Sequence, residues 1–396
     1  MFNFTTLPPL SLYIHLPWCA RKCPYCDFNS HEQRDALPER DYTQALLRDL
    51  EHDLPRIWGR RIVSIFIGGG TPSLFSPEAV NELLSGVRAR VNLLPDAEIT
   101  LEANPGSSEY AKFAEFRAAG VNRLSIGIQS FNDDHLRALG RIHGRREAIA
   151  AAEAAHYAGF DNFNLDLMYA LPGQNTEQAL ADLNTAVALE PAHISHYQLT
   201  IEPNTFFHSH PPVLPDDDAA WTMQEHCQQR LAERGYQHYE ISAYAQAGRR
   251  CKHNLNYWEF GDYLGIGAGA HGKITDAQQQ SITRLWKIKQ PRAYMDGVAA
   301  AKHVGGEQQL TPYDALLEFM MNALRLSEGF SLESFAAHTG LPLAWVEAPL
   351  RDAVARGLIE WSGSHVRPTP HGARLLNDLL QLFMMDDAAA SQRHTA

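Results

Sequence analysis

Short apolar runs alternate with longer amphipathic stretches between residues 11 and 199. The clearest run, Ile62–Ile67, is apolar at almost every position and is followed directly by glycines. Uninterrupted apolar runs of this length are typical of strands that are buried on both faces. The pattern predicts six strands, which are Ser11–Leu16, Ile62–Ile67, Glu98–Glu102, Asn122–Gln129, Asn162–Met168 and His193–Leu199.

Helical periodicity fills the intervals between these runs, for example at Glu39–Asp53, Ser108–Ala119 and Arg145–Ala158. Strands that alternate with helices form parallel βα units. Six units are too few to close an eight-fold barrel, so we expect an α/β fold with an open (β/α)6 partial barrel. Sites in such folds form at the carboxyl ends of the strands, which directs attention to the residues that follow each run.

The second half of the chain has a different pattern of predicted elements. A helix at Ala219–Arg234 and a strand at Tyr239–Tyr244 follow a proline-rich acidic segment. From Thr311 onward, helical stretches and a short hairpin ending at Arg367 indicate a winged-helix-like α+β module. We therefore expect a core domain at 1–240, a connecting region at 241–310, a C-terminal domain at 311–385 and a disordered tail at 386–396.

Composition and charge exclude several classes of protein. Of the 396 residues, 45% are hydrophobic and 20% are charged, as in a globular protein. The formal net charge of −12 opposes a broad nucleic-acid footprint. No apolar run is long enough to span a membrane, and the N-terminus lacks a secretory signal. The expected location is a reducing cytoplasm, with a peripheral position at the inner face of the membrane as an option.

Cysteines carry the most specific chemical signal. The chain has five, and three of them fall within Cys19-Ala-Arg-Lys-Cys23-Pro-Tyr-Cys26. Thiolates suit zinc or iron–sulfur clusters, but a structural zinc site needs four ligands and no second Cys or His pair is at finger spacing. An odd number of cysteines fits disulfides poorly. Three thiolates on a cubane leave one iron open, so we expect Cys19, Cys23 and Cys26 to hold a [4Fe–4S] cluster.

The Cys-x3-Cys-x2-Cys spacing, with Tyr25 before the last cysteine, resembles the radical S-adenosylmethionine (SAM) superfamily. The flanking segments Tyr13–Cys19 and Asp27-Phe28 resemble the oxygen-independent coproporphyrinogen III dehydrogenase family. Within that family the chain is most similar to the HemW haem chaperone branch. The resemblance extends over nearly the whole chain and implies a radical SAM core followed by a C-terminal domain of the HemN type.

A glycine run, Gly68-Gly69-Gly70-Thr71, follows the second strand, and glycines allow close approach of a ligand to the backbone. The resemblance implies that a first SAM molecule binds at the open iron and contacts Tyr13, Gly69 and Glu102. A carboxylate at 102 suits the two ribose hydroxyls. The resemblance also implies a second SAM site, whose positions are Tyr25, Gly70, Thr71, Gln129, Arg141 and Asp166. Whether one or two SAM molecules bind stays open.

The segment His253-Asn-Leu-Asn-Tyr257-Trp258 matches the HNxxYW pattern that the resemblance associates with haem. Imidazole is a common axial ligand and aromatic rings stack on porphyrins, so His253, Tyr257 and Trp258 are candidate haem contacts. A histidine packed among aromatic rings is the alternative. Cys251 and His271, which lies in a glycine-rich loop, are further candidate ligands.

Two departures from the family pattern bear on function. The dehydrogenases carry another cysteine two residues after the motif, where this chain has Phe28, and they have a longer N-terminal extension. Both favour a haem chaperone that delivers haem to haem-dependent, including respiratory, proteins. The alternative is a dehydrogenase that converts coproporphyrinogen III to protoporphyrinogen IX, so enzymatic activity stays open.

A third alternative is a winged-helix DNA-binding regulator. Residues 311–380 carry five arginines and no lysine against eight acidic residues, which opposes it. The expected partners are therefore haem, haem-acceptor proteins that include membrane-bound ones, and a second copy of the chain, with no nucleic acid. The recipient protein, the chemistry of haem attachment and the cleavage of SAM are not determined by the sequence.

Overall fold

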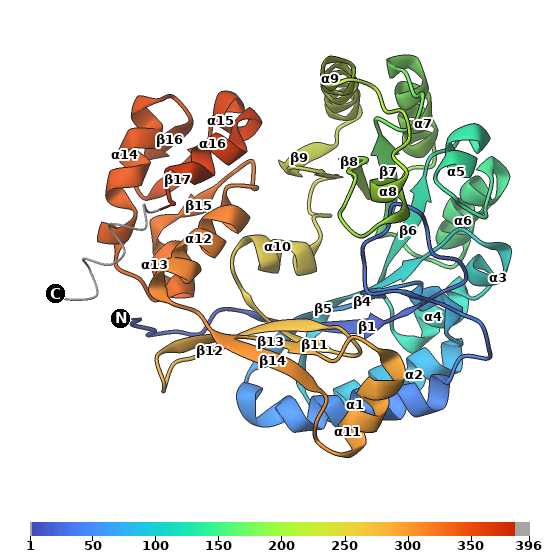
Figure 1. Cartoon of the computed structure of the whole chain (residues 1–396), viewed down its shortest axis with the longest axis horizontal. Coiled ribbons are helices and arrows are strands. Elements are labelled where there is room, and N and C mark those ends of the chain that lie inside the picture. Colours follow the sequence, from blue (N-terminus) through green and yellow to red (C-terminus); the bar gives the residue numbers. More distant parts are fainter. Residues whose placement is uncertain (1, 385–396) are drawn as a thin grey trace.

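A computed structural model describes residues 2–384. Its centre is a twelve-stranded mixed sheet, drawn with its covering helices in Figure 1. The strands are, in chain order, β1 (Leu10–Leu16), β4 (Arg61–Gly69), β5 (Asn92–Ala103), β6 (Arg123–Gln129), β7 (Phe163–Tyr169), β8 (His193–Gln198), β9 (Gln237–Glu240), β10 (Ala243–Ala245), β11 (Asp262–Ile266), β12 (His271–Asp276), β13 (Ser281–Lys287) and β14 (Val304–Gln309). They lie side by side in the order β14-β13-β12-β11-β1-β4-β5-β6-β7-β8-β10-β9.

Strands β1 and β4 to β8 are parallel neighbours and correspond to the six predicted strands. The sheet is open, so the predicted open α/β architecture is confirmed. Its strands are buried on both faces because helices cover them, which explains the continuous apolar runs. Leu12, Ile14, Ile65 and Ile67, for example, are fully buried in the main hydrophobic core.

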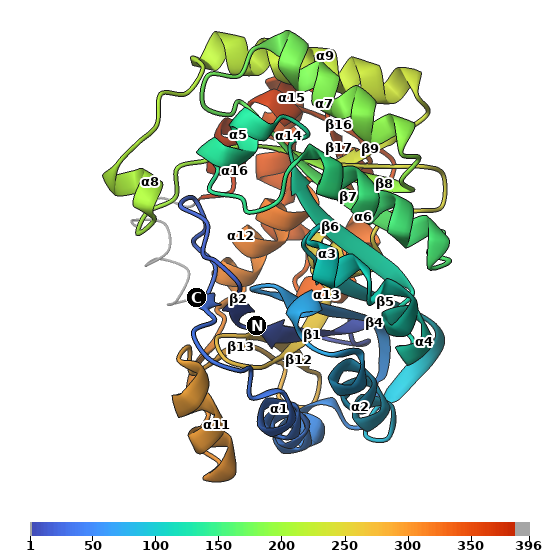
Figure 2. The same ribbon diagram turned by 90° about the vertical axis from the view of Figure 1, so that its right-hand side faces the viewer.

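Helices connect the strands and cover the sheet (Figures 1 and 2). They are α1 (Glu39–Asp53), η1 (Leu54–Ile57), η2 (Pro72–Leu74), α2 (Pro77–Arg88), α3 (Ser107–Tyr110), α4 (Phe113–Ala119), α5 (Asp133–Ala138), α6 (Arg145–Tyr157), α7 (Thr176–Ala188), α8 (Phe206–Ser209), α9 (Asp217–Glu233), α10 (Lys252–Trp258) and α11 (Pro291–Ala299). Polar caps fix several helix starts; the Asn175 side chain, for instance, accepts a hydrogen bond from the backbone N–H of Gln178. The helix expected at Ser108–Ala119 is divided into α3 and α4.

Residues 262–309 add four strands to the sheet on the far side of β1. Strand β11 pairs parallel to β1, and β12, β13 and β14 continue as an antiparallel meander. The glycine-rich segment Leu264–Gly272 therefore ends β11, makes a tight turn and begins β12, so His271 lies on a strand rather than in a loop. At the opposite edge, the expected strand Tyr239–Tyr244 is replaced by the two short strands β9 and β10.

The C-terminal module contains helices and a three-stranded sheet of order β15-β17-β16. Its elements are α12 (Pro312–Ala323), β15 (Phe330–Ser331), α13 (Leu332–Thr339), η3 (Leu343–Trp345), α14 (Glu347–Ala355), β16 (Ile359–Ser362), β17 (His365–Pro368), α15 (Pro370–Arg374) and α16 (Leu376–Gln381). The predicted hairpin corresponds to β16 and β17. The module's own core is centred on Phe319, Phe330 and Phe335, and Phe4 and Phe260 from outside the module pack into it.

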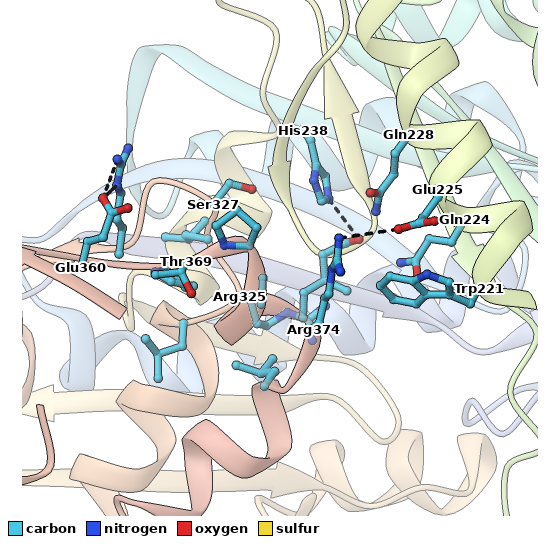
Figure 3. Close-up of a pocket in the computed structure, with 18 residues that line it drawn as sticks. Trp221, Gln224, Glu225, Gln228, His238, Arg325, Ser327, Glu360, Thr369 and Arg374 are labelled. Carbon is cyan, nitrogen blue, oxygen red and sulfur yellow. Dashed lines mark hydrogen bonds and ion pairs between the residues drawn. The ribbon is translucent and has the colours of Figure 1, made fainter. Parts of the chain in front are cut away.

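A cavity of about 640 Å³ separates the module from α9 and β9 (Figure 3). Along residues 2–384, no helix has the length and apolar character that crossing a membrane requires. The tail predicted to be disordered, 386–396, lies outside the described residues.

Candidate functional site

Two short strands close the cysteine loop, which we define as residues 19–32. Strand β2 (Trp18–Cys19) pairs parallel to β3 (His31–Glu32), and inside the loop the Cys26 N–H donates to the Cys23 carbonyl at 3.2 Å. Burial raises the pKa of the Cys19 and Cys26 thiols, and neighbouring sulfurs of the same loop raise them further: Cys26 and Cys23 act on Cys19, and Cys23 acts on Cys26. Metal binding would deprotonate such thiols outright.

The donor set fits an iron–sulfur cluster. No three metal-ligating side chains of the described chain converge closely enough to hold one metal ion. A cubane does not require this, because each of its protein thiolates binds a different iron. The loop follows the carboxyl end of β1. In it, Cys19 is buried and Cys23 and Cys26 are partly buried. Three soft ligands on one short closed loop are the arrangement that such a cluster needs.

The glycine run lies directly against the start of the cysteine loop. The Gly70 N–H donates to the Leu16 carbonyl at 2.8 Å, and the Thr71 N–H donates to the Trp18 carbonyl at 2.7 Å. A Cβ atom at residue 70 would lie 2.4 Å from the Trp18 oxygen. Glycine is therefore required at this position by the protein's own backbone, so loss of SAM binding in a Gly70 variant would not by itself locate SAM there.

The positions expected to contact the first SAM lie together. The Gly69 N–H donates to Glu102 Oε2 at 3.1 Å, with Gly69 in a left-handed conformation (φ 120°). Burial and then the charge of Asp166 raise the pKa of Glu102 to about 8. The Tyr13 hydroxyl lies 2.9 Å from His15 Nδ1 and on the same cavity as Glu102. A carboxyl group here is neutral near pH 7 and can donate as well as accept hydrogen bonds.

Arg141 links three of the expected positions. Its Nη2 donates to Asn104 Oδ1 at 2.8 Å, and its Nη1 lies 3.6 Å from Cys23 Sγ. The Asn104 Nδ2 in turn donates to Thr71 Oγ1 at 2.9 Å. Asn104, which the sequence analysis did not identify, therefore joins Arg141 to Thr71, while Arg141 contacts Cys23 directly. Its position two residues beyond Glu102, at the carboxyl end of β5, is the signal that could have indicated it.

The remaining positions of the second set each have a protein partner. Gln129 Oε1 accepts from the Tyr197 hydroxyl at 2.7 Å, and the ring of Tyr25 packs against Phe207 with centroids 6.4 Å apart. Asp166 accepts from a serine of β6 and an asparagine of β7 at 3.1 and 2.8 Å. None of the three lines the cavity that Glu102 lines. Tyr25 and Gln129 lie near Arg141, whereas the charge of Asp166 raises the pKa of Glu102.

That cavity has a volume of about 580 Å³. One wall contains Tyr13, Gly69 and Glu102, and the neighbouring wall contains Tyr257 and Trp258 of the HNxxYW segment. The segment forms helix α10, which the sequence analysis did not predict and which packs against β4 and α12 (Figure 1). The candidate positions for SAM and for haem therefore share one cavity.

His253 lies behind Tyr257, outside the lining of this cavity. It is fully buried, with Nδ1 2.9 Å from the Ser64 hydroxyl and Nε2 3.0 Å from the Tyr257 hydroxyl. Burial and then the charge of Arg123 lower its pKa to about 3, so the ring is neutral. Cys251 is also buried, and burial raises its thiol pKa to about 12. Both groups are enclosed by protein.

Comparisons with known proteins agree with this architecture. The profile of the Radical SAM superfamily matches residues 13–186, and that of the HemN C-terminal domain matches residues 310–375. A curated protein named heme chaperone HemW, from Escherichia coli (strain K12), is 51% identical over 380 residues, which cover 96% of this chain and 99% of that protein. The Bacillus subtilis (strain 168) protein of the same name is 34% identical over 381 residues, which cover 94% of this chain and 99% of that protein.

A solved structure shares the fold. The structure described as "Coproporphyrinogen III oxidase (HemN) from Escherichia coli is a Radical SAM enzyme" superposes with a TM-score of 0.80. The match covers 95% of this chain and 90% of that one, at 24% identity. At this identity the likeness establishes the common fold, not a common reaction.

Proposed function

Because this chain belongs to the HemW family of radical SAM proteins, we propose that it binds haem and delivers it to haem-dependent acceptor proteins. The relatives named heme chaperone align along almost their whole length, and the HNxxYW segment lies on a ligand-sized cavity. This second observation carries the proposal, because a chaperone must hold its cargo in a site that is also open to an acceptor.

The volume and the aromatic residues of the cavity suit a flat ligand with a large π-system. Pockets for such ligands span roughly 300–1,000 Å³, and this one has about 580 Å³. Tyr257, Trp258 and Tyr263 supply aromatic surface, which packs well on flat π-systems. We propose that Tyr257 and Trp258 contact the porphyrin directly.

His253 has a different proposed role from that of the two aromatic residues. Axial ligation of iron by His253 would require its hydrogen bonds to Ser64 and Tyr257 to break and the ring to leave its buried position. We propose instead that His253 holds the Tyr257 hydroxyl and so fixes the position of the Tyr257 ring in the cavity wall.

The cofactor residues retain the roles implied by family membership, as proposals. Cys19, Cys23 and Cys26 would hold a [4Fe–4S] cluster, and Tyr13, Gly69 and Glu102 the first SAM. When bound, the cluster would supply an electron donor. Arg141 places a permanent positive charge 3.6 Å from the Cys23 sulfur. A second SAM would contact the positions Tyr25, Gly70, Thr71, Gln129, Arg141 and Asp166.

The proposed setting is a reducing compartment. All five cysteines are free of disulfide bonds in the structure, including the three of the cysteine loop. Among the acceptors we include membrane-bound haem proteins, which would bring the chain to the inner face of the membrane. A second copy of the chain stays a proposed partner.

The test is a titration of cluster-reconstituted protein with haem under anaerobic conditions, followed by transfer to an apo-haem protein. We expect low-micromolar or tighter binding, which corresponds to about −8 kcal/mol or better. Coproporphyrinogen III, supplied with SAM and a reductant, should yield no protoporphyrinogen. Multiple-turnover decarboxylation would assign the dehydrogenase function instead, and absence of haem binding would overturn the chaperone proposal.

A further inference from the structure

The third side of the cavity comes from the β12–β13 hairpin. In this antiparallel pair His271 faces Trp286 and Lys273 faces Arg284. Side chains two residues apart on a strand, and those directly opposite on a partner, point to the same face of the sheet. His271, Lys273 and Arg284 therefore project together, and all three line the cavity, as does Lys289 shortly after β13. We call His271, Arg284 and Lys289 the cationic rim.

The members of this face differ in how fully they are already paired. Lys273 is buried, with Nζ 2.8 Å from Asp262 Oδ1 and 4.1 Å from the centre of the Phe260 ring. Arg284 bonds Glu318 through Nε at 3.1 Å and through Nη2, and its Nη1 donates to the Tyr263 hydroxyl, yet a quarter of its side chain is exposed. Within residues 2–384, the ammonium group of Lys289 has neither a hydrogen bond nor an ion pair. Lys289 is thus the cation on this cavity that is free to bind an anion.

His271 is the imidazole on this cavity with free ring nitrogens. His15 also lines it, but its Nδ1 lies 2.9 Å from the Tyr13 hydroxyl and its Nε2 2.9 Å from the Asn29 carbonyl. His271 is exposed, and in the described part of the chain its ring has no hydrogen-bond partner. Partial burial of the ring and then the charges of Lys289 and Arg284 lower its pKa, so the neutral, iron-binding form prevails.

The rim is fixed to the cysteine loop. The side-chain amide of Asn29 donates to the Lys289 carbonyl at 2.9 Å and to the Ala268 carbonyl at 2.8 Å. The backbone that carries Lys289 is therefore held in place, while its side chain remains free at the mouth of the cavity. A positioned cation at the open edge of an aromatic pocket suits a ligand that is apolar on its face and anionic at its margin.

We propose that the cationic rim orients haem in this cavity: Lys289, assisted by Arg284, binds the propionate carboxylates, and His271 is the axial ligand of the iron. This proposal rests on the proposed haem-binding function and specifies its site. The aromatic residues Tyr257 and Trp258 then cover the porphyrin from the opposite wall.

The test combines two variants with three probes: ferric haem, its dimethyl ester and metal-free protoporphyrin IX. Lys289→Ala should weaken binding of haem and of protoporphyrin about tenfold, as expected for loss of one charged hydrogen bond. The dimethyl ester should bind both proteins equally, because it has no carboxylate to lose. Lys302→Ala, an exposed lysine away from the cavity, is the matched control and should bind like wild type.

His271→Ala should shift the Soret band of bound haem and weaken haem binding, with partial recovery on addition of imidazole. It should leave the affinity for metal-free protoporphyrin unchanged, since that ligand has no iron to coordinate. His371→Ala, an exposed histidine of α15, is the matched control. Far-UV circular dichroism and cluster content establish that each variant is folded.

The outcomes distinguish failure of the proposed haem-binding function from failure of the proposed haem site. If wild type binds no haem, the proposed function fails. If wild type binds haem and Lys289→Ala and His271→Ala match it with every probe, the cationic rim is not the haem site. A spectral shift confined to His253→Phe would make His253 the ligand instead. Loss of SAM binding in Lys289→Ala, with haem binding intact, would assign the free cation to SAM.

Discussion

The two sides of the shared cavity are built in opposite ways. On the inner wall, formed by β1, β4, β5 and α10, most polar groups have a protein partner: Glu102 bonds the Gly69 amide, and His253, directly behind the wall, is held at both nitrogens. The buried Trp258 Nε1 is an exception. On the cationic rim, Lys289 and His271 are exposed and, among the described residues, unpaired. A wall whose donors are already satisfied can shape a ligand site, whereas unpaired groups are the ones that can bind.

Whether a polar group is already paired also determines whether its removal affects the stability of the fold or the binding of a ligand. Removing a buried, paired group leaves its partners unsatisfied inside the protein, which costs folding energy. Removing an exposed, unpaired group costs folding almost nothing and should affect the ligand alone. Each of the following experiments measures how far this division holds.

The largest effect is expected next to the inner wall, at the cysteine loop. Replacing Cys19, Cys23 and Cys26 together by alanine should abolish iron binding after anaerobic reconstitution, because no nearby thiolate replaces them. Iron content and visible absorption are the measurements. Cys227→Ala, a buried cysteine of α9, is the control and should retain its iron. A triple variant with iron near the wild-type level would refute the ligand assignment.

A pH-dependent effect should come from Glu102 in the cluster-free protein. Its folded pKa of about 8 lies above the ordinary 4.5, so the unfolded carboxyl ionises first as pH rises. The folded state then binds more protons, and its stability falls between about pH 5 and pH 8, by roughly 3 kcal/mol for this group. Urea unfolding should show a shallower decline in Glu102→Gln. Parallel pH profiles for the two proteins would contradict the buried, protonated carboxyl.

Substitutions of His253 and His271 allow a direct comparison of how much a residue of each region contributes to the free energy of unfolding. His253→Ala should lower the free energy of unfolding by about 2 kcal/mol, because it leaves the Tyr257 hydroxyl without a partner and the Ser64 hydroxyl with Ser11 alone. His271→Ala should change it by less than about 0.5 kcal/mol. Urea denaturation of both variants alongside wild type gives the two values. Equal losses would show that His271 is as integral to the fold as His253.

The smallest effect is expected at the cavity between the C-terminal module and α9. There Arg374 lies 3.6 Å from Glu225 and 5.1 Å from the centre of the Trp221 ring, with roughly half of both charged side chains exposed (Figure 3). Exposed contacts of this kind contribute well under about 1 kcal/mol. Arg374→Ala should therefore leave the thermal midpoint within about a degree or two of wild type. A large drop in the thermal midpoint would show that this contact stabilises the packing of the C-terminal module against α9.

The inner wall was largely predictable from the sequence, because its strands are continuous apolar runs and its polar residues follow them at the carboxyl ends. Glu102, Thr71 and the three cysteines are adjacent to such runs in the chain. Of the cationic rim, the sequence indicated only His271 as a candidate; Arg284 and Lys289 were not predictable, since they are isolated charges whose importance arises from the pairing of β12 with β13. The placement of β11 beside β1 joins residues about 250 positions apart, and no local pattern encodes such a contact.

That same placement constrains how the chain can be made. Strand β1 lies between β4 and β11, so it emerges early from a ribosome but acquires one of its two neighbours only when residues 262–266 have been synthesised. Until then an apolar strand near the N-terminus has an unpaired edge, which is a hazard for intermolecular association. The long sequence separation also predicts slow closure of this part of the sheet. Completion of the cavity proposed for haem, which needs β12 and β13, should then be among the last events of folding.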